Sequence, residues 1–578
     1  MTLIEALTIV NQPPPAESPS FRVLLACGFT PLHIETFLAA HLRIQLPGAS
    51  IGIEKGLYGD LAGTLEQLSL RDFHAAAIAL EWSDLDPRLG YRSLGGWRLK
   101  DIPDIEATVA QSLTRLRNAL EAAPRQTVIA ICLPTLTLPP AFHTAGWQAS
   151  TASLRLSAAI AEFAVWAVSL GSIRVANQEY LNRFSAAPER FLIKSQLIAG
   201  LPYAIPHAEA VGRILAMLIQ PPPPKKGLIT DLDDTLWKGI AGEVGAEGVC
   251  WDLASHAQPH GLYQQLLASL ATQGVLIAAA SKNNPAVVEQ AFTRKDMLLD
   301  KSQVFPFEVH WNAKSGSVTR ILKQWNIDAS SVVFIDDNAM ELDEVKIAHP
   351  EVACFRFPKE DPQAVLDLLL LLRDLFGKPD VREEDSLRLD SLRAGAILQQ
   401  AAASPESAET LLARSEAVVH LDLNPPSGDG RVLELVNKTN QFNINGLRYI
   451  DADWVAQTSS PGAVVLLVSY RDKYGPLGKI AVLKGVLRET VLDIDCWVMS
   501  CRAFSRRIEY QVVKCLFDRF PVSVLQLHYM RTPKNEPVGV FLESIAGVVA
   551  ATGPVQIKRD DFAGCCPALY HSVKYSGD

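Results

Sequence analysis

Short hydrophobic runs alternate with longer segments of helical periodicity over the first part of the chain. The runs that read as strands are 21–27, 75–80 and 127–133, and the helical segments are 31–41, 105–122 and 154–170. Strands that alternate with helices in this way are typical of an α/β domain built on a parallel sheet. We therefore predict such a domain over residues 1–220.

A run of four prolines at 221–224, followed by Lys225-Lys226-Gly227, predicts a domain boundary, because proline supports neither helix interiors nor central strands. The alternation then resumes, with strands expected at 228–230, 275–280, 304–309 and 332–335 and helices at 262–272, 285–292 and 317–325. This pattern predicts a second α/β domain, of the doubly wound type, over 226–378.

The alternation of short strands and helices ends after residue 378. Residues 379–417, rich in Leu, Ala, Glu and Arg, predict a helical connector. Longer strands follow: 462–470 and 479–489 read as a hairpin, and a strand to Ser500, a helix through Cys515 and a strand over 524–530 come next. We predict an α+β domain over 418–578.

Composition places the chain among multidomain globular proteins. Its 578 residues are 48% hydrophobic and 20% charged, and the net charge of −9 argues against a chain-wide affinity for nucleic acid. Nine irregularly spaced cysteines without a zinc-binding pattern indicate reduced thiols. Because the most apolar stretches, such as 365–372 and 463–468, are far shorter than the ~20 residues that span a bilayer, we expect a cytoplasmic protein without membrane contact.

The most informative stretch is Ile-Thr-Asp-Leu-Asp-Asp-Thr-Leu-Trp at 229–237. Asp231 and Asp233 lie two positions apart where a strand is expected to end, so both side chains point the same way. One carboxylate can then attack phosphorus while the other handles the leaving-group proton. The alternative for the pair alone is a polar turn after a strand.

Asp231-x-Asp233-x-Thr235 resembles the nucleophile motif of the haloacid dehalogenase-like (HAD) phosphatases, and three further matches follow in order. Ser281 falls where that family holds a phosphate oxygen, Lys314 where it places a neutralising cation, and Asp336 where an acid completes a magnesium site. Separately, Ser281 could be a helix N-cap and Lys314 a surface lysine.

The resemblance implies a role for each matching residue. Catalysis is assigned to Asp231, Asp233, Ser281 and Lys314, Mg²⁺ binding to Asp231, Asp233 and Asp336, and substrate contacts to Thr235, Lys282, Asn283, Asp337 and Asn338. The spacing between the motifs leaves room for a flap, helices and strands but for no large cap domain. We therefore expect an open site.

The amino-acid sequence around the motifs is similar to that of the FkbH-like group of HAD proteins. The matching stretches are 235–239, 242–245, 281–284, 311–315 and 334–338. Residues 81–88 resemble the group's N-terminal domain, which is related to SGNH hydrolases, and 436–443 and 499–502 resemble its C-terminal acetyltransferase-like (GNAT-like) domain.

This resemblance implies a Mg²⁺-dependent glyceryltransferase/phosphatase of polyketide biosynthesis. Such a protein takes 1,3-bisphosphoglycerate, a phosphorylated three-carbon donor, removes phosphate and loads the glyceryl unit onto the phosphopantetheine thiol of a holo acyl carrier protein. Two alternatives stay open: a small-molecule HAD phosphatase without acyl transfer, and an inert HAD-based scaffold that binds a carrier protein.

The chain departs from the group's pattern at two places. Ala280 stands where many members carry a cysteine, which leaves Cys250 as the nearest candidate thiol, although a lone cysteine is more often a buried small hydrophobe. The stretch 502–507 lacks both glycines of the coenzyme A phosphate loop, so we expect no acetyl transfer from coenzyme A. Arg502, Arg506 and Arg507 could still meet the phosphate of a pantetheine arm, or form a solvated helix start.

The N-terminal domain shows no Gly-Asp-Ser nucleophile motif followed by a convincing Asp-x-x-His. We therefore expect no hydrolysis there.

Overall fold

A computed structural model describes residues 1–13, 18–124, 126–378, 392–393, 409–410, 412–425, 430–449, 451–473, 475–500, 503–504 and 506–576. The chain divides into two compact units, Met1–Pro223 and Pro224–Asp578. The division falls in the proline run at 221–224. Each unit is described by itself below.

The first unit is built on a parallel five-stranded sheet in the order β2-β1-β3-β4-β5. The strands are β1 (Ser20–Ala26), β2 (Ser50–Lys55), β3 (Ala75–Ala79), β4 (Val128–Cys132) and β5 (Ile173–Val175). The helices are α1 (Leu3–Asn11), α2 (Leu32–Gln45), α3 (Leu61–Glu66), α4 (Trp82–Leu85), α5 (Ile102–Glu121), α6 (Thr151–Ser169), α7 (Gln178–Phe184), α8 (Ile193–Ala199) and α9 (Ile205–Ile219).

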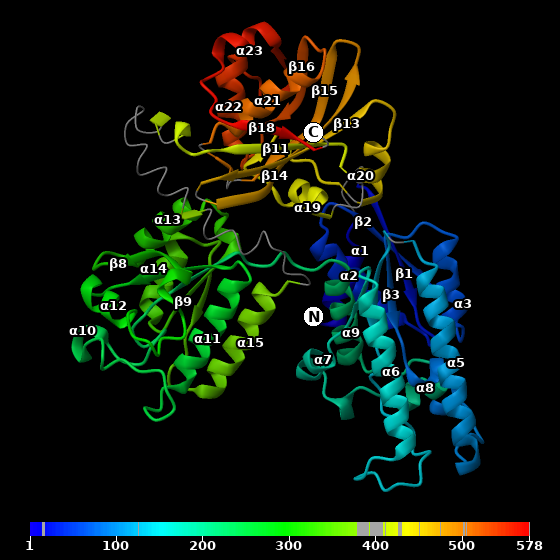
Figure 1. The fold of residues 1–578 in the computed structure, drawn as a ribbon. Coiled ribbons are helices and arrows are strands. Elements are labelled where there is room, and N and C mark those ends of the chain that lie inside the picture. Colours follow the sequence, from blue (N-terminus) through cyan, green and yellow to red (C-terminus); the bar gives the residue numbers. More distant parts are fainter. Residues whose placement is uncertain are drawn as a thin grey trace. The chain divides into compact units, whose positions relative to one another are not determined.

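Helices cover both faces of this sheet (Figure 1). Along β1, Val23 and Leu25 pack in the cluster that contains α2 and α9, whereas Leu24 and Ala26 pack in the cluster that contains α5 and α6. Successive residues of a strand point to opposite faces, so a strand buried on both sides is hydrophobic throughout. The predicted strands 21–27, 75–80 and 127–133 are confirmed as β1, β3 and β4, and the partly exposed edge strand β2 was missed.

The second unit begins with another parallel five-stranded sheet, in the order β10-β9-β6-β7-β8. Its strands are β6 (Gly227–Thr230), β7 (Leu276–Ser281), β8 (Val304–Val309), β9 (Val332–Asp336) and β10 (Ala353–Arg356). Its helices are α10 (Ala241–Val244), α11 (Gln258–Thr272), α12 (Pro285–Ala291), α13 (Lys314–Trp325), α14 (Ala339–Ala348) and α15 (Pro362–Phe376). The predicted α/β alternation is confirmed, and β6 lies between β7 and β9.

An eight-stranded, mostly antiparallel sheet completes the second unit, in the order β17-β16-β15-β14-β13-β11-β18 with β12 beside β15. The strands are β11 (Val418–Leu423), β12 (Phe442–Asn443), β13 (Ala463–Asp472), β14 (Gly475–Arg488), β15 (Val491–Met499), β16 (Val524–Met530), β17 (Thr552–Lys558) and β18 (Ser572–Tyr575). The helices are α19 (Gly430–Lys438), α20 (Asp451–Thr458), α21 (Ile508–Arg519), α22 (Glu536–Ala546) and α23 (Arg559–Cys565). Nearly all of the predicted connector 379–417 lies outside the described residues.

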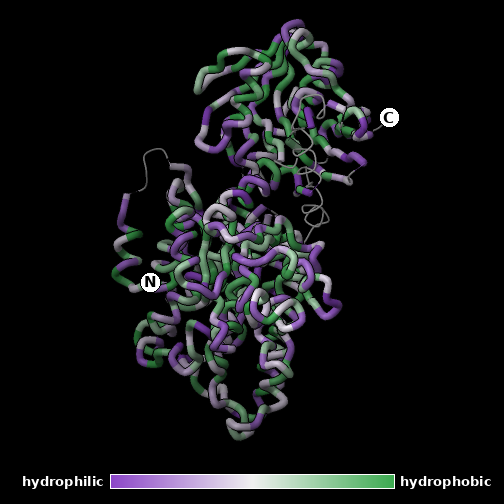
Figure 2. The backbone as a smooth tube through the Cα atoms, turned by 90° about the vertical axis from the view of Figure 1, so that its left-hand side faces the viewer, coloured by the Kyte–Doolittle hydropathy of each residue, from purple (hydrophilic) through white to green (hydrophobic). Residues whose placement is uncertain are grey.

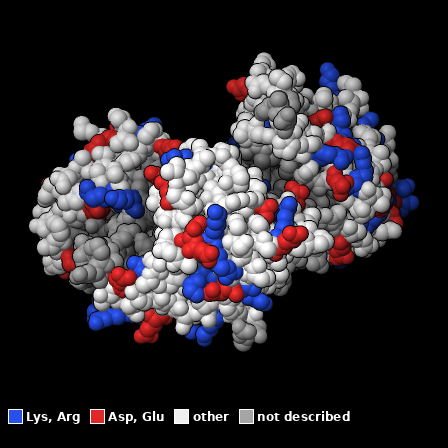
Figure 3. All heavy atoms as spheres, turned by 90° about the horizontal axis from the view of Figure 1, so that it is seen from above, with Lys and Arg blue, Asp and Glu red and all other residues white. Residues whose placement is uncertain are grey.

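Hydrophobic and hydrophilic residues are interleaved along the elements of both units (Figure 2). Within the described ranges, one helix, α6, has the length and the apolar composition that a membrane span requires. On the face drawn in Figure 3, Lys and Arg side chains lie among Asp and Glu side chains, and neither sign forms an extended patch.

Candidate active site at the carboxyl end of the β6 sheet

Three neighbouring strands bring the predicted motifs to one edge of the second unit's parallel sheet. Asp231 directly follows β6, Ser281 is the last residue of β7, and Asp336 is the last residue of β9. β7 and β9 flank β6 in parallel, so the three carboxyl ends meet. Ligands of open α/β sheets bind at this edge.

Lys314, the first residue of α13, lies between two of these acids. Its Nζ is 2.9 Å from Asp231 Oδ1 and 2.6 Å from Asp336 Oδ2. All three side chains are buried. Burial alone would lower the pKa of Lys314, but the two adjacent carboxylates raise it above its ordinary value, which keeps the ammonium charged.

Negative charge exceeds positive charge at this point of the structure. Burial raises the pKa of Asp231, with Lys314 and the Ser281 hydroxyl opposing that shift. Burial, and next the charge of Asp231, raise the pKa of Asp336 to about 7. Two buried carboxylates that share one ammonium favour the arrival of further positive charge.

Asp233 is turned away from this cluster by three hydrogen bonds. Its Oδ1 accepts from Trp237 Nε1 at 2.9 Å and from the Ala241 amide at 3.1 Å, and its Oδ2 accepts from Asn283 Nδ2 at 2.9 Å. Burial is the main reason why its pKa is nevertheless raised. A fixed carboxyl group with a raised pKa suits the acid–base role better than the nucleophilic one.

Three carboxylates could hold a metal ion at this edge. Oxygens of Asp231, Asp336 and Asp337 lie within 4.8 Å of one another. An all-oxygen, acidic donor set matches a hard divalent cation such as Mg²⁺. In this group the Asp337 carboxylate takes the place that the sequence assigned to Asp233.

Asp337 also belongs to an ion-pair cluster that the sequence did not indicate. Lys359 Nζ lies 3.0 Å from Asp337 Oδ2 and 2.7 Å from Asp234 Oδ2. Asp234 has a φ of 52° and accepts from the Gly239 amide, which closes the turn after Asp231. The sequence offered one indication of this turn, an aspartate after the expected strand end, because aspartate tolerates the left-handed conformation. Lys359 is far from Asp234 along the chain, so no local pattern predicted their ion pair.

Two of the predicted substrate-contacting residues hold the loops of the site together. Thr235 is fully buried, and its Oγ1 accepts from the Asp337 amide at 3.1 Å. Asn338 donates its amide to Asp336 Oδ1 and caps α14 through Met340. These contacts give Thr235 and Asn338 positioning roles.

Asn283 and Lys282, two more of the predicted substrate contacts, differ in exposure. Asn283 is buried against Asp233. Lys282, whose side chain is 35% exposed, pairs with Glu341 at 2.7 Å. Part of the Lys282 side chain therefore remains open to solvent.

The flap over the site is small. Between β6 and α11 the chain forms a single four-residue helix, α10, and the bridge Lys238↔Cys250. Cys250 is half-buried, and its Sγ lies 4.0 Å from the Lys238 carbonyl oxygen. Ala280 is completely buried in β7.

The arginines that were predicted to contact the phosphate of a pantetheine arm do not form a common binding site among the described residues. Arg506 is 1% exposed and pairs with Asp472, which is also buried, over the ring of Tyr470. Arg507 donates to the Ala568 carbonyl and contacts Glu409. Arg502 lies outside the described residues. A phosphate would have to displace Asp472 to reach Arg506.

In the C-terminal sheet, the parallel strands β15 and β16 are hydrogen-bonded to each other over only part of their length. β15 and β16 pair directly only over Val491–Ile494 and Val524–Leu527. Beyond that point, β12 pairs with the end of β15, the Ile444 amide donates to Trp497 O at 3.2 Å, and the Met530 amide donates to Ile444 O at 2.9 Å. The segment 442–444 therefore connects β15 and β16 where the two strands no longer pair directly.

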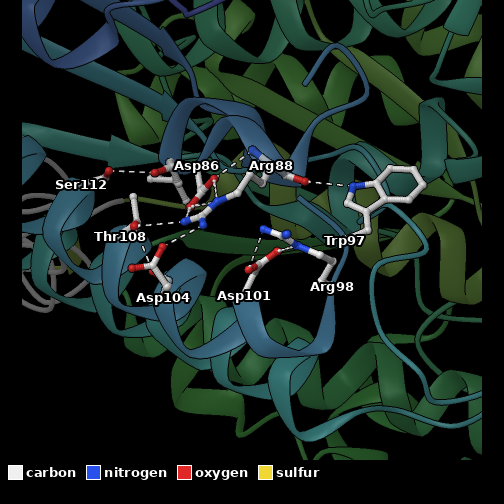
Figure 4. Close-up of polar contacts among 9 residues, drawn as sticks. Asp86, Arg88, Trp97, Arg98, Asp101, Asp104, Thr108 and Ser112 are labelled. Atoms are coloured by element: carbon white, nitrogen blue, oxygen red, sulfur yellow. Dashed lines mark hydrogen bonds and ion pairs between the residues drawn. The ribbon is translucent and has the colours of Figure 1, made fainter. Parts of the chain in front are cut away.

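The motif at 81–88 in the first unit forms a clamp of hydrogen bonds and ion pairs (Figure 4). Arg88 holds the buried Asp86 through its Nε and Nη2 atoms and reaches Asp104 at 2.7 Å. The Arg88 carbonyl accepts from Trp97 Nε1, and the Leu85 carbonyl accepts from Ser112. These contacts fix the loop after β3, which gives the motif a structural role.

No family model matches the chain, and no curated protein matches it. A solved structure does match: the crystal structure of the N-terminal part of the protein BF1531 from Bacteroides fragilis, containing a phosphatase domain complexed with Mg. The match covers 66% of this chain and 100% of that chain, with a TM-score of 0.51 and 19% sequence identity. At this identity the chain is similar to that structure in fold.

Proposed function

We propose that the chain is a Mg²⁺-dependent phosphatase in which Asp231 is the nucleophile. The observation that carries this proposal is Lys314, whose buried ammonium contacts both Asp231 and Asp336 at the carboxyl end of a parallel sheet. The Mg-bound phosphatase domain named in the BF1531 structure supports the same choice.

Asp231 attacks phosphorus, and the bond from phosphorus to the leaving oxygen breaks. Asp233, fixed by Trp237, Ala241 and Asn283, gives its proton to that oxygen. It then takes a proton from the water that attacks the aspartyl-phosphate, and phosphate is released. Lys314 neutralises charge on the phosphoryl oxygens.

Asp231, Asp336 and Asp337 would hold Mg²⁺. When bound, the ion adds positive charge beside the transferred phosphoryl group.

Phosphate release by the full chain from p-nitrophenyl phosphate and from acyl phosphates tests this proposal. We expect activity that requires Mg²⁺, is removed by chelation, and falls by about 10³-fold or more in Asp231→Asn. Asp367→Asn, on the exposed side of α15, is the matched control and should keep full activity. Equal activity of wild type and Asp231→Asn would contradict the proposal.

We further propose that the donor is a phosphorylated three-carbon acyl compound, 1,3-bisphosphoglycerate, and the acceptor a holo acyl carrier protein. The chemistry at Asp231 removes the phosphate ester at the third carbon of the donor. The carrier thiol attacks the acyl carbon, the bond from that carbon to the acyl phosphate oxygen breaks, inorganic phosphate leaves, and the thiol proton goes to solvent. Resemblance to the FkbH-like group supports this choice, as does a flap with one short helix, since a pantetheine arm must enter.

Mass spectrometry of the carrier protein after incubation with this chain, Mg²⁺ and the donor tests the acyl transfer. A glyceryl mass shift is expected, and its absence with several carriers would overturn the transfer step alone.

Ala280, the group's cysteine position, favours the simpler alternative of a small-molecule phosphatase. Phosphate release without any carrier protein would support that alternative. A chain that binds a carrier protein without any turnover would instead be a scaffold.

A further inference from the structure

Helix α6 of the first unit carries two apolar stripes where the fold requires one. Its inward stripe is buried against the sheet and comprises Ala152, Leu156, Ile160, Phe163 and Ala167. Its outward stripe is exposed and comprises Leu154, Ala158, Ala161, Val165 and Val168. Leu154, Val165 and Val168 are 59%, 75% and 57% exposed.

The neighbouring helix α5 covers the same face of the sheet and has no such second stripe (Figure 1). Its outward positions at the matching spacing are Ala107, Gln111, Thr114 and Asn118. A surface helix normally presents polar residues on this side. The outward stripe of α6 is therefore not explained by the packing of the first unit.

The outward stripe has the spacing of a coiled-coil seam. From Leu154 to Val168 the steps are four, three, four and three residues. This alternation keeps a row of side chains facing one partner helix, and α6 is 19 residues long. Alanines at the middle of the row allow two helix backbones to approach closely.

The row is complementary to itself when two copies run antiparallel. With Leu154 opposite Val165 of the second copy, Ala158 falls opposite Ala161, and a two-fold axis relates both pairs. Arg155 and Glu162 lie one heptad apart on the same flank of the row, and both are exposed. Within its own chain, Arg155 also pairs with Glu106 of α5 at 3.2 Å. In this register Arg155 faces Glu162 of the second copy, twice by symmetry.

We propose that the outward face of α6 is a homodimer interface in which two copies of this chain pair their α6 helices antiparallel. Two-fold interfaces of this kind use the same surface on both subunits. A single pair of helices buries little area, so the dimer should be weak, with a Kd on the order of micromolar.

Sedimentation velocity of the full chain over a concentration series tests the proposal. Wild type is expected to dimerise, and Ala161→Arg should lose the dimer because the arginine separates the helices at their closest approach. Ala107→Arg, the same change at an exposed alanine of α5, is the matched control and should leave Kd unchanged. All three proteins should keep the same circular dichroism spectrum and phosphate release.

Charge reversal sharpens the test of the antiparallel register. Arg155→Glu and Glu162→Arg should each weaken dimerisation about 10-fold, and the double variant should regain most of the loss. Three outcomes would overturn the proposal: a wild type that stays monomeric at about 100 μM, far above the expected Kd, a dimer that Ala161→Arg leaves intact, or a monomer that binds neutral lipid vesicles through the same stripe.

Discussion

The two parallel sheets of this chain each place an acid within two residues of the end of a central strand, but the two acids have different surroundings. In the first unit, the buried carboxylate of Glu81 accepts four hydrogen bonds, from the Thr135 amide at 3.0 Å, Thr135 Oγ1 at 2.6 Å, the Leu136 amide at 3.2 Å and Tyr203 Oη at 2.6 Å. In the second unit, Asp231 instead shares the ammonium of Lys314 with Asp336.

The difference lies in whether the negative charge is compensated. Beside Glu81, Thr135 also contacts His207, whose pKa burial lowers to about 3, and the Thr135 carbonyl accepts from the buried guanidinium of Arg190 at 3.0 Å. Burial raises the pKa of Glu81 as it raises those of Asp231 and Asp336, but beside Asp231 two buried acids share one lysine. A buried acid with a raised pKa alone therefore does not indicate a catalytic site, and the surplus of buried carboxylates beside Lys314 is the feature that supports the proposal for Asp231.

Removing the shared cation should have the largest effect on phosphate release. In Lys314→Met, Asp231 and Asp336 lose their counter-charge, so we expect about 10³-fold less activity and a free energy of unfolding lowered by about 3–5 kcal/mol. Phosphate release and urea unfolding measure the two changes.

The double variant Lys314→Met/Asp336→Asn is the informative control for the lysine. It should regain most of the stability, because one of the two unpaired charges is gone, but none of the activity. If Lys314→Met were as stable and active as wild type, the shared ammonium would not be what distinguishes the Asp231 site from the Glu81 site.

Removing the acid–base group should have the next largest effect. Asp233→Asn should slow steady-state turnover by about 10²-fold, since proton transfer typically contributes that much. Stopped-flow measurement with p-nitrophenyl phosphate should still show a burst of nitrophenolate, because that leaving group departs without a proton while the aspartyl-phosphate then persists. Turnover without a burst and at the wild-type rate would assign Asp233 a structural role like that of Glu81.

Lys282 should affect the choice of substrate more than the chemistry. In Lys282→Met, KM for a donor with a second phosphate should rise about 10-fold, whereas kcat for p-nitrophenyl phosphate should stay within two-fold, as expected when only binding is removed (about 1.4 kcal/mol). Lys301→Met, at another lysine–glutamate pair of the same unit, is the control and should change neither value. A lower kcat for both the bisphosphorylated donor and p-nitrophenyl phosphate would instead indicate that Lys282 takes part in the catalytic step.

Glu81→Gln should leave phosphate release unchanged and lower stability by about 1–3 kcal/mol, because an amide cannot accept all four hydrogen bonds. Burial raises the pKa of Glu81 above 4.5, so the folded state binds its proton more tightly than the unfolded state. The contribution of Glu81 to stability is then complete below about pH 4.5 and declines as the pH rises towards the folded-state pKa.

Urea unfolding of wild type and Glu81→Gln between pH 4 and 8 measures this pH dependence. The stability advantage of wild type should shrink as the pH rises. Glu121→Gln, at the exposed end of α5, should not alter the slope. A growing advantage would mean that Glu81 is stabilised as a charged group.

Much of the fold could be predicted from local patterns. Fully hydrophobic runs such as 332–335 read as central strands because both of their faces are buried, and β9 confirms this. Strands with little burial, such as β2 and β10, carry no such pattern and were missed. The helical connector proposed at 379–417 stays a prediction.

The sequence by itself determined that Asp231, Ser281 and Asp336 lie at the ends of strands, because this depends on the hydrophobic residues next to each of them. The helix predicted at 317–325 begins three residues earlier, at Lys314. Tertiary structure alone decided that β7 and β9 flank β6, and so which side chains share one edge of the sheet. It also turned Asp233 towards Trp237, brought Lys359 to Asp337, and enclosed Arg506 with Asp472. These contacts join residues from separate elements, so their geometry follows from packing and charge burial, which no local pattern encodes.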